Sequence, residues 1–202
     1  MTNDLILDSK TLNEEVMKLV KDYTLDKVDL SLVGSGQVEE VKNTSGRPNL
    51  YYKWLACLIK LTNPHQIVEL GAAAGISTLM MASEMDKSSI FYSVDIDPTL
   101  AWKWMNIDYP QVKKILGDTL DMGIWKNIEL SKTDVWFFDS LHTFKQLSSE
   151  LKLYSPYFKK GAILVFDDIQ MSELRPIWES LPYDKFETSD FNHYSGFGHA
   201  IV

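Results

Sequence analysis

Three acidic residues have the type and spacing to bind a divalent cation. Asp139 follows one apolar run of the chain, and Asp167 and Asp168 follow a later one. Three carboxylates brought close together would repel one another and raise their pKa values, and a cation relieves that repulsion. Oxygen ligands suit Mg²⁺ or Mn²⁺ better than zinc, so we predict a metal site formed by these three residues. Each acid taken singly could instead be a solvated strand end or a helix cap.

His142 stands three residues after Asp139 and is the candidate general base. An imidazole with an ordinary pKa of about 6.5 can take up and release a proton near neutral pH. A purely structural histidine is the alternative. We assign no role to His65, His193 or His199, although the last two lie in or near the final predicted hairpin and could border the cleft.

A segment rich in glycine and alanine, residues 71–75, precedes a predicted helix. Small residues let the backbone turn tightly and approach a ligand, and the helix N-terminus offers N–H groups to an anionic moiety. The spacing does not match GxGxxG, which disfavours a pyrophosphate ligand. Asp95 follows the turn by about 20 residues, a place where a carboxylate accepts ribose hydroxyls. Asp97 competes for this role but could cap a helix, and the turn itself could serve packing alone.

These residues need a scaffold that brings the ends of several apolar runs to one edge. Such runs alternate with helical stretches, which predicts a parallel sheet covered on both faces. The predicted strands are 66–70, 90–95, 112–116, 134–139 and 162–166. The predicted helices between them include 76–85, 99–106 and 144–157. Residues 186–188 and 196–202 predict an antiparallel hairpin at one sheet edge. The expected fold is therefore a doubly wound, mostly parallel seven-stranded α/β sheet, in which ligands lie beyond the carboxyl ends of the strands.

Two N-terminal helices are predicted before this sheet, over residues 9–22 and 49–61. Residues 31–48 between them are polar and contain glycine and serine, which indicates a linker or mobile loop. The part from Gly34 to Arg47 is the candidate lid over the site. We accordingly expect an N-terminal extension over 1–48 and the main domain over 49–202.

The overall composition excludes several classes of protein. The 202 residues are 45% hydrophobic, which is typical of a globular chain. A net charge of −8 argues against a dedicated nucleic-acid binder. Cys57 is the single cysteine, so neither an intrachain disulfide nor a cysteine-based zinc cluster is expected. With no signal peptide or membrane span recognisable, we expect a cytoplasmic protein.

Several segments together resemble a known family. They are VELGAAAGIST, SVDIDP, FFDSLHTFKQLSSELKLYSPYFKKGAILVFDDI and the final SGFGHAIV. Over about residues 50–202 the chain is similar to the class I, Rossmann-like S-adenosylmethionine (SAM) methyltransferases, and most of all to the methyltransferase-24 group. That group includes macrocin-type sugar O-methyltransferases and cephalosporin-hydroxylase-like proteins.

The resemblance implies both a cofactor site and a metal site. The implied SAM-binding residues are Glu69, Gly71, Ala73, Gly75, Ser77, Asp95 and Asp118, with Ala73 where the family motif has its middle glycine. Asp118 corresponds to a residue that binds the adenine amino group, although it could instead be a helix N-cap. The implied metal ligands are Asp139, Asp167 and Asp168, with His142 and Asp139 as the catalytic pair.

The expected activity is metal-dependent O-methylation of a small-molecule hydroxyl on a sugar, polyol or phenol. Lys and Arg are sparse near the expected site, which disfavours a multiply phosphorylated substrate. The alternatives are a metal-independent SAM methyltransferase and a non-catalytic protein that has kept the SAM-binding fold. A homodimer is a further expectation, and neither nucleic acid nor membrane is an expected partner.

Overall fold

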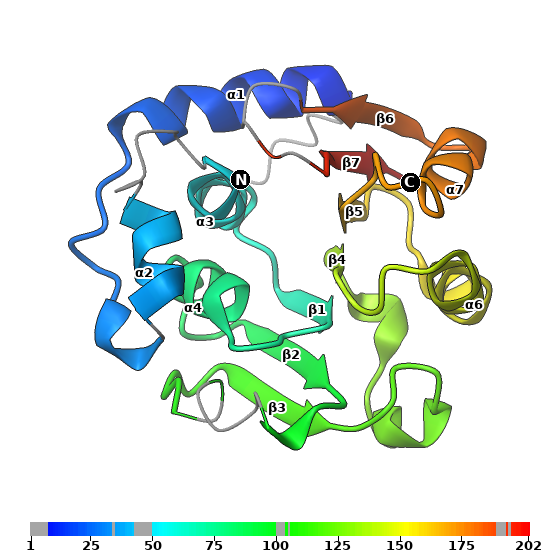
Figure 1. Cartoon of the computed structure of the whole chain (residues 1–202), viewed down its shortest axis with the longest axis horizontal. Helices are drawn as coiled ribbons and strands as arrows, with labels where there is room; N and C mark the ends of the chain where they lie inside the picture. Colours follow the sequence, from blue (N-terminus) through cyan, green and yellow to red (C-terminus); the bar gives the residue numbers. More distant parts are fainter. Residues whose placement is uncertain are drawn as a thin grey trace.

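A seven-stranded sheet forms the centre of the molecule (Figure 1). The computed structural model describes residues 8–33, 35–42, 50–99, 104, 106–188, 193 and 195–202. The strands are β1 (Gln66–Leu70), β2 (Ile90–Asp95), β3 (Val112–Leu116), β4 (Val135–Phe138), β5 (Ile163–Asp167), β6 (Asp184–Glu187) and β7 (Phe197–Ile201). Their order is β3-β2-β1-β4-β5-β7-β6, in which β1 to β5 run parallel, β7 runs antiparallel to β5, and β6 runs antiparallel to β7. The predicted doubly wound α/β fold is confirmed.

Helices cover both faces of this sheet (Figure 1). The α-helices are α1 (Ser9–Asp22), α2 (Ser35–Lys42), α3 (Tyr51–Thr62), α4 (Ile76–Ala82), α6 (Phe144–Tyr154) and α7 (Arg175–Ser180). Short 3-10 helices are η1 (Leu30–Leu32), η2 (Met122–Trp125), η3 (Leu130–Lys132) and η4 (Ser155–Tyr157). One apolar core lies under α1, α3 and α4, and a second lies under α6 and α7.

Strand β4 shows why the sequence forms this three-layered structure. Val135 and Phe137 belong to the core under α3 and α4, whereas Trp136 and Phe138 belong to the core under α6. Successive side chains of a strand point to opposite faces, so a strand buried on both sides reads as a continuous apolar run. The run of aromatic and aliphatic residues is therefore what predicts a central strand.

The strand predictions hold to within two residues. The strands at 66–70, 90–95 and 112–116 have the predicted bounds. The C-terminal hairpin adds one feature that the sequence pattern did not specify, because β7 inserts between β5 and β6. Asp167 at the end of β5 therefore pairs with Phe197 at the start of β7. The segment that precedes β7 is brought to the carboxyl end of β5.

The prediction of a linker over residues 31–48 is wrong in its first part. This stretch contains the end of η1 and the whole of α2. Val38 and Val41 recur at a spacing of three, and both pack on the core under α3. This small apolar stripe stabilises a helix in a segment whose glycine and serine content suggested a loop. Most of the rest of the candidate lid, 43–47, lies outside the described residues, as does most of the predicted helix at 99–106.

Helix α1 is attached to the far edge of the sheet. The Ser9 backbone N–H donates to Asp184 of β6 at 2.5 Å, and His199 of β7 donates from Nε2 to the Ser9 carbonyl at 2.8 Å. Inside the core, the Trp54 indole N–H donates to Asn13 of α1. His199 therefore joins two elements of the fold and lies away from the strand ends. Within the described residues, no helix is long and apolar enough to cross a bilayer.

Candidate active site

The turn after β1 is built from residues in the left-handed conformation. Gly71, Ala73 and Gly75 have φ values of +95°, +45° and +85°. A Cβ atom on Gly71 would lie 2.0 Å from the backbone oxygen of Asp139, so only glycine fits there. A Cβ atom on Gly75 would likewise lie 2.6 Å from the side chain of Ile107. The two glycines are required by close contacts, whereas Ala73 between them adopts the left-handed conformation with its side chain in place.

Replacing Ala73 by glycine is expected to stabilise the protein by about 0.5 to 1 kcal/mol, because an L-residue with positive φ carries strain that glycine lacks. The Ala73 side chain is exposed, so little packing is lost. Urea denaturation of both proteins measures the difference. The control is Ala72→Gly, since Ala72 is buried and has negative φ, and this variant should lose stability. Destabilisation by both changes would contradict the strain assigned to Ala73.

Glu69 supports this turn from inside the protein. Its fully buried carboxylate accepts hydrogen bonds from the hydroxyls of Ser77, Thr78 and Ser93, with Ser77 Oγ at 2.6 Å. The indole N–H of Trp104 donates to Ser93 at 2.9 Å. Both Glu69 and Ser77 were predicted to bind the cofactor, and in the described geometry their side chains bond to each other. They hold β1, β2 and α4 together beneath the turn.

Burial raises the pKa of Glu69 to about 7, with the three hydroxyl donors opposing the shift. The folded protein thus binds a proton at Glu69 more tightly than the unfolded chain does, so stability falls as pH rises from about 4.5 to about 7. Glu69→Gln removes this dependence. Relative to wild type, the variant should gain on the order of 3 kcal/mol between pH 5 and pH 8 in denaturation experiments.

The same substitution at the exposed Glu14 controls for loss of a surface charge. Parallel stability profiles of Glu69→Gln and wild type across this pH range would contradict the raised pKa of Glu69.

Asp95 ends β2 and connects it to the turn. Its Oδ2 accepts the backbone N–H groups of Ala72 and Ala73 at 2.9 and 2.6 Å, and its Oδ1 accepts that of Asp97 at 2.7 Å. Asp97 in turn accepts the N–H and hydroxyl of Thr99, which is the capping role considered as its alternative. Asp95 is therefore the carboxylate that lies against the glycine-rich turn.

Asp118 follows β3 and is exposed. Its Oδ1 accepts the N–H of Leu120 at 2.8 Å, which closes a local turn. The neighbouring Thr119 donates to Glu150, a buried residue of α6 that also accepts from the hydroxyl of Ser140. Glu150 thus links the segments after β3 and β4. It was not predicted from the sequence, since one acid in a helix carries no distinctive pattern.

The acids after β4 and β5 meet around a histidine. His142 lies between two of them, with Nδ1 2.6 Å from Asp168 Oδ2 and Nε2 3.2 Å from Asp139 Oδ1. Asp168 has φ of +58°, a left-handed conformation that aspartate tolerates better than most residues. The Asp168 backbone N–H donates to Asp167 Oδ1 at 2.9 Å. The four residues predicted for metal binding and catalysis are therefore neighbours.

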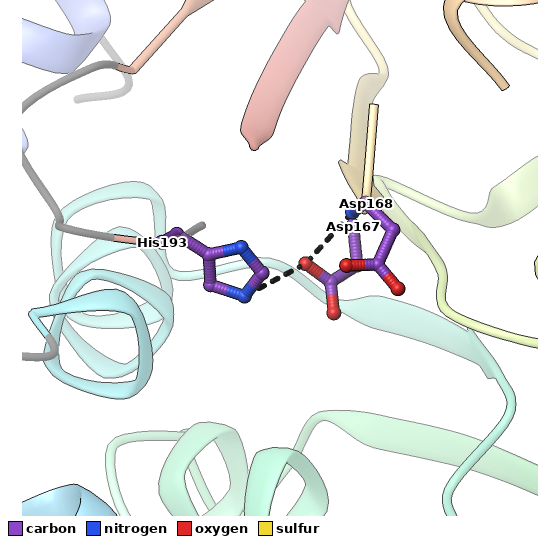
Figure 2. A group of neighbouring side chains, drawn as sticks. All are labelled: Asp167, Asp168 and His193. Atoms are coloured by element: carbon purple, nitrogen blue, oxygen red, sulfur yellow. Dashed lines mark hydrogen bonds and ion pairs between the residues drawn. The ribbon is translucent and has the colours of Figure 1, made fainter. Parts of the chain in front are cut away.

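His193 also belongs to this cluster. Its Nε2 lies 3.2 Å from Asp167 Oδ1, and Figure 2 shows the imidazole facing the two acids. One ligand atom each from Asp167, Asp168 and His193 lie within 4.8 Å of one another. No role was assigned to His193 from the sequence. The signal that could have found it is topological, since a strand antiparallel to β5 must begin beside the acids that end β5.

Burial and like charges set the protonation of this cluster. Burial raises the pKa of Asp167 well above its ordinary value, and the charges of Asp139 and Asp168 add to the shift. Burial likewise raises the pKa of Asp139, against a hydrogen bond from His142. Burial also acts to raise the pKa of Asp168, but hydrogen bonds from His142 and Ser195 outweigh it and the pKa is lowered.

Hydrogen bonds to Asp139 and Asp168 raise the pKa of His142 to about 10, so this residue carries a positive charge at neutral pH. Burial, together with like charge that one imidazolium does not offset, keeps the pKa values of Asp139 and Asp167 raised. The cluster therefore has the charge and the oxygen atoms that a divalent cation needs.

The turn and the cluster adjoin each other. Gly71 packs against the Asp139 carbonyl, and the Asp139 N–H donates to the Leu70 carbonyl at 2.9 Å. Strands β1 and β4 are neighbours at the point where the strand order reverses, which is where ligands bind in open α/β sheets. A ligand on the turn would thus lie next to a ligand at the carboxylates.

Known proteins share this fold. The O-methyltransferase TomG from Streptomyces achromogenes, solved with SAM, aligns with a TM-score of 0.66 at 16% identity and covers 97% of this chain and 99% of its own. The Bacillus cereus O-methyltransferase, solved with SAH, aligns with a TM-score of 0.59 at 20% identity, covering 99% and 94%. A methyltransferase from Geobacter sulfurreducens aligns with a TM-score of 0.62 at 16% identity, and the alignment covers 98% of this chain and 100% of its own.

A curated relative covers less of the chain. The tRNA1(Val) (adenine(37)-N6)-methyltransferase of Haemophilus influenzae is 27% identical over 96 residues. That match covers 47% of this chain and 35% of the relative, so it spans about a third of the relative's length.

A family model identifies the domain directly. The methyltransferase-24 model, described as a methyltransferase domain, matches residues 68–169. This range is half of the chain and contains the turn after β1, Asp95 and all three acids of the cluster. The chain therefore belongs to the methyltransferase-24 family of methyltransferase domains.

Proposed function

We propose that this protein transfers the methyl group of SAM to a hydroxyl of a small molecule, with a divalent cation at the carboxylates. The observation that carries the proposal is the contact between Gly71 and the Asp139 carbonyl. It makes the turn that would hold the methyl donor adjacent to the acids that would hold the acceptor. The reacting atoms could then approach within about 3.5 Å, which is the main requirement for methyl transfer.

The turn and Asp95 support SAM as the donor. The glycines of the turn let a ligand approach the backbone closely, and Asp95 is hydrogen-bonded to the same turn. The solved O-methyltransferases from Streptomyces achromogenes and Bacillus cereus, which share the fold, contain SAM and SAH respectively. We propose that the exposed Asp118 contacts the adenine, while Glu69 and Ser77 act by fixing the turn.

The cluster fits a divalent cation by its donor set and by its excess of negative charge. A bound cation supplies Lewis-acid chemistry, lowering the pKa of a coordinated substrate hydroxyl. Asp167 and Asp168 would hold it, with Asp139 close to both. His142 would accept the hydroxyl proton on an imidazole nitrogen. With a cation bound at the acids, the charge of Asp139 and Asp168 would be offset, and the pKa of His142 would then fall from about 10 toward its ordinary value.

The acceptor is best described as a neutral polyol, glycoside or phenol. The acids crowd the strand ends, and a phosphorylated or polyanionic acceptor would be repelled by them. The same repulsion weighs against a tRNA acceptor like that of the Haemophilus influenzae methyltransferase, since the present chain has a net charge of −8. Metal-independent transfer is the second candidate, because His142 lies against both Asp139 and Asp168 and could offset their charge without a cation.

A coupled assay of SAH release tests the proposal. The purified protein is stripped with EDTA and mixed with SAM and a panel of polyols, glycosides and phenols, with and without Mn²⁺ or Mg²⁺. We expect turnover that requires a cation and that Asp168→Ala abolishes. Turnover that persists in EDTA and in Asp168→Ala would favour the metal-independent alternative.

A further inference from the structure

His193 lies about as far from Asp167 as two neighbouring ligands of one metal ion lie from each other. Its Nε2 is 3.2 Å from Asp167 Oδ1, a contact that a dashed line marks in Figure 2. Adjacent ligands of an octahedral ion with bonds of about 2.1 Å lie about 3.0 Å apart. The third atom, from Asp168, completes a group within 4.8 Å. Two ligands of one such ion lie at most about 4.2 Å apart, so small movements of these side chains would bring all three atoms onto a single cation.

The chain holds this imidazole firmly in place. The His193 side chain is 12% exposed, and its ring lies 5.1 Å from the ring of Tyr51, a buried residue of α3. The Gly196 N–H donates to the His193 carbonyl at 3.1 Å, and the Gln170 N–H donates to the Ser195 carbonyl at 2.8 Å. Ser195, two residues from His193, is thereby bonded to the segment after β5.

The second ring nitrogen of His193 has its own partner. Nδ1 lies 3.4 Å from the hydroxyl of Ser195. When that nitrogen carries the proton, Nε2 presents its lone pair to the acids. Metal-binding histidines usually have this arrangement, in which an outer partner fixes the tautomer of the ring.

We propose that His193 is a nitrogen ligand of the cation at Asp167 and Asp168, and that the site therefore selects a first-row transition ion such as Mn²⁺ or Co²⁺ over Mg²⁺. This inference rests on the proposed cation site and names the residue that determines its metal specificity. An all-oxygen site suits Mg²⁺, whereas imidazole strengthens binding of transition ions much more than that of Mg²⁺. The competing interpretation is a simple ion pair between His193 and Asp167.

Calorimetry with the full-length, EDTA-stripped protein distinguishes the two. Mn²⁺, Co²⁺ and Mg²⁺ are titrated into wild type, His193→Gln, His193→Ala and the control His65→Ala, an exposed histidine before β1. We expect wild type and the control to bind Mn²⁺ and Co²⁺ more tightly than Mg²⁺, by about tenfold or more. His193→Gln, which offers an oxygen instead, should lose most of that preference while retaining Mg²⁺ binding.

A spectroscopic reading is independent of affinity. Pulsed electron paramagnetic resonance of bound Mn²⁺ should show coupling to a ¹⁴N nucleus in wild type that is lost in His193→Gln. Unchanged coupling and an unchanged metal preference in both His193 variants would overturn the inference and leave the cation site standing. If wild type binds none of the ions, the inference and the proposed cation site both fail.

Discussion

Gly71→Ala is expected to destabilise the fold by more than about 4 kcal/mol and to abolish SAM binding. The new Cβ atom would lie 2.0 Å from the Asp139 backbone oxygen, and the backbone carries φ of +95°. Neither atom can move without separating the ends of β1 and β4. Urea denaturation and calorimetric titration of SAM measure the two effects.

Gly161→Ala is the matched control. Gly161 also has positive φ, at +80°, but a Cβ atom there would meet nothing within 4 Å. This variant should lose only about 1 to 2 kcal/mol of stability, the cost of an alanine with positive φ, and should bind SAM normally. Equal losses in the two variants would mean that Gly71 matters for its conformation alone and not for the close approach of the strand ends.

Asp167→Asn should have opposite effects with and without a cation. In EDTA the variant should be more stable than wild type at neutral pH, because it replaces a buried acid, whose pKa burial and the charges of Asp139 and Asp168 raise, by a neutral amide. A saturating concentration of Mn²⁺, about 100 times the dissociation constant, should stabilise wild type by about 2.7 kcal/mol and the variant by much less. Thermal denaturation of both proteins under the two conditions measures this reversal.

Asp86→Asn removes an exposed carboxylate that caps its own turn, and it controls for the general effect of the change. It should not alter the response to Mn²⁺. A wild type that Mn²⁺ does not stabilise, or an Asp167→Asn that Mn²⁺ stabilises equally, would contradict the cation site.

The sequence predicts the centre of the sheet well because the strands there are buried on both faces. Strands such as Val135–Phe138 stand out as short apolar runs between polar or small residues. The helix at Ser9–Asp22 is likewise marked by its amphipathic spacing, whereas its N-cap, Asp8, is identified only in the structure. Parallel strands end at a common edge, so the meeting of Asp139, His142, Asp167 and Asp168 could be predicted from chain order alone.

Other features depend on tertiary contacts that no local pattern encodes. The helix Ser35–Lys42 rests on two valines against the core, in a stretch whose composition predicts a loop. The approach of His193 depends on the insertion of β7 beside β5. Asp95 lies at the turn as expected, but its bonds to the backbone of Ala72 and Ala73 emerge only from the folded geometry.

The most direct test of the proposed activity is calorimetric titration of SAM into the purified protein, first with EDTA and then with Mn²⁺. We expect one site with a micromolar dissociation constant, corresponding to about −8 kcal/mol. The wild-type and Ala73→Gly proteins are measured side by side, because Ala73 stands where the related motif has glycine. If neither protein binds SAM in either condition, the proposed methyltransferase activity is contradicted and the non-catalytic alternative is favoured.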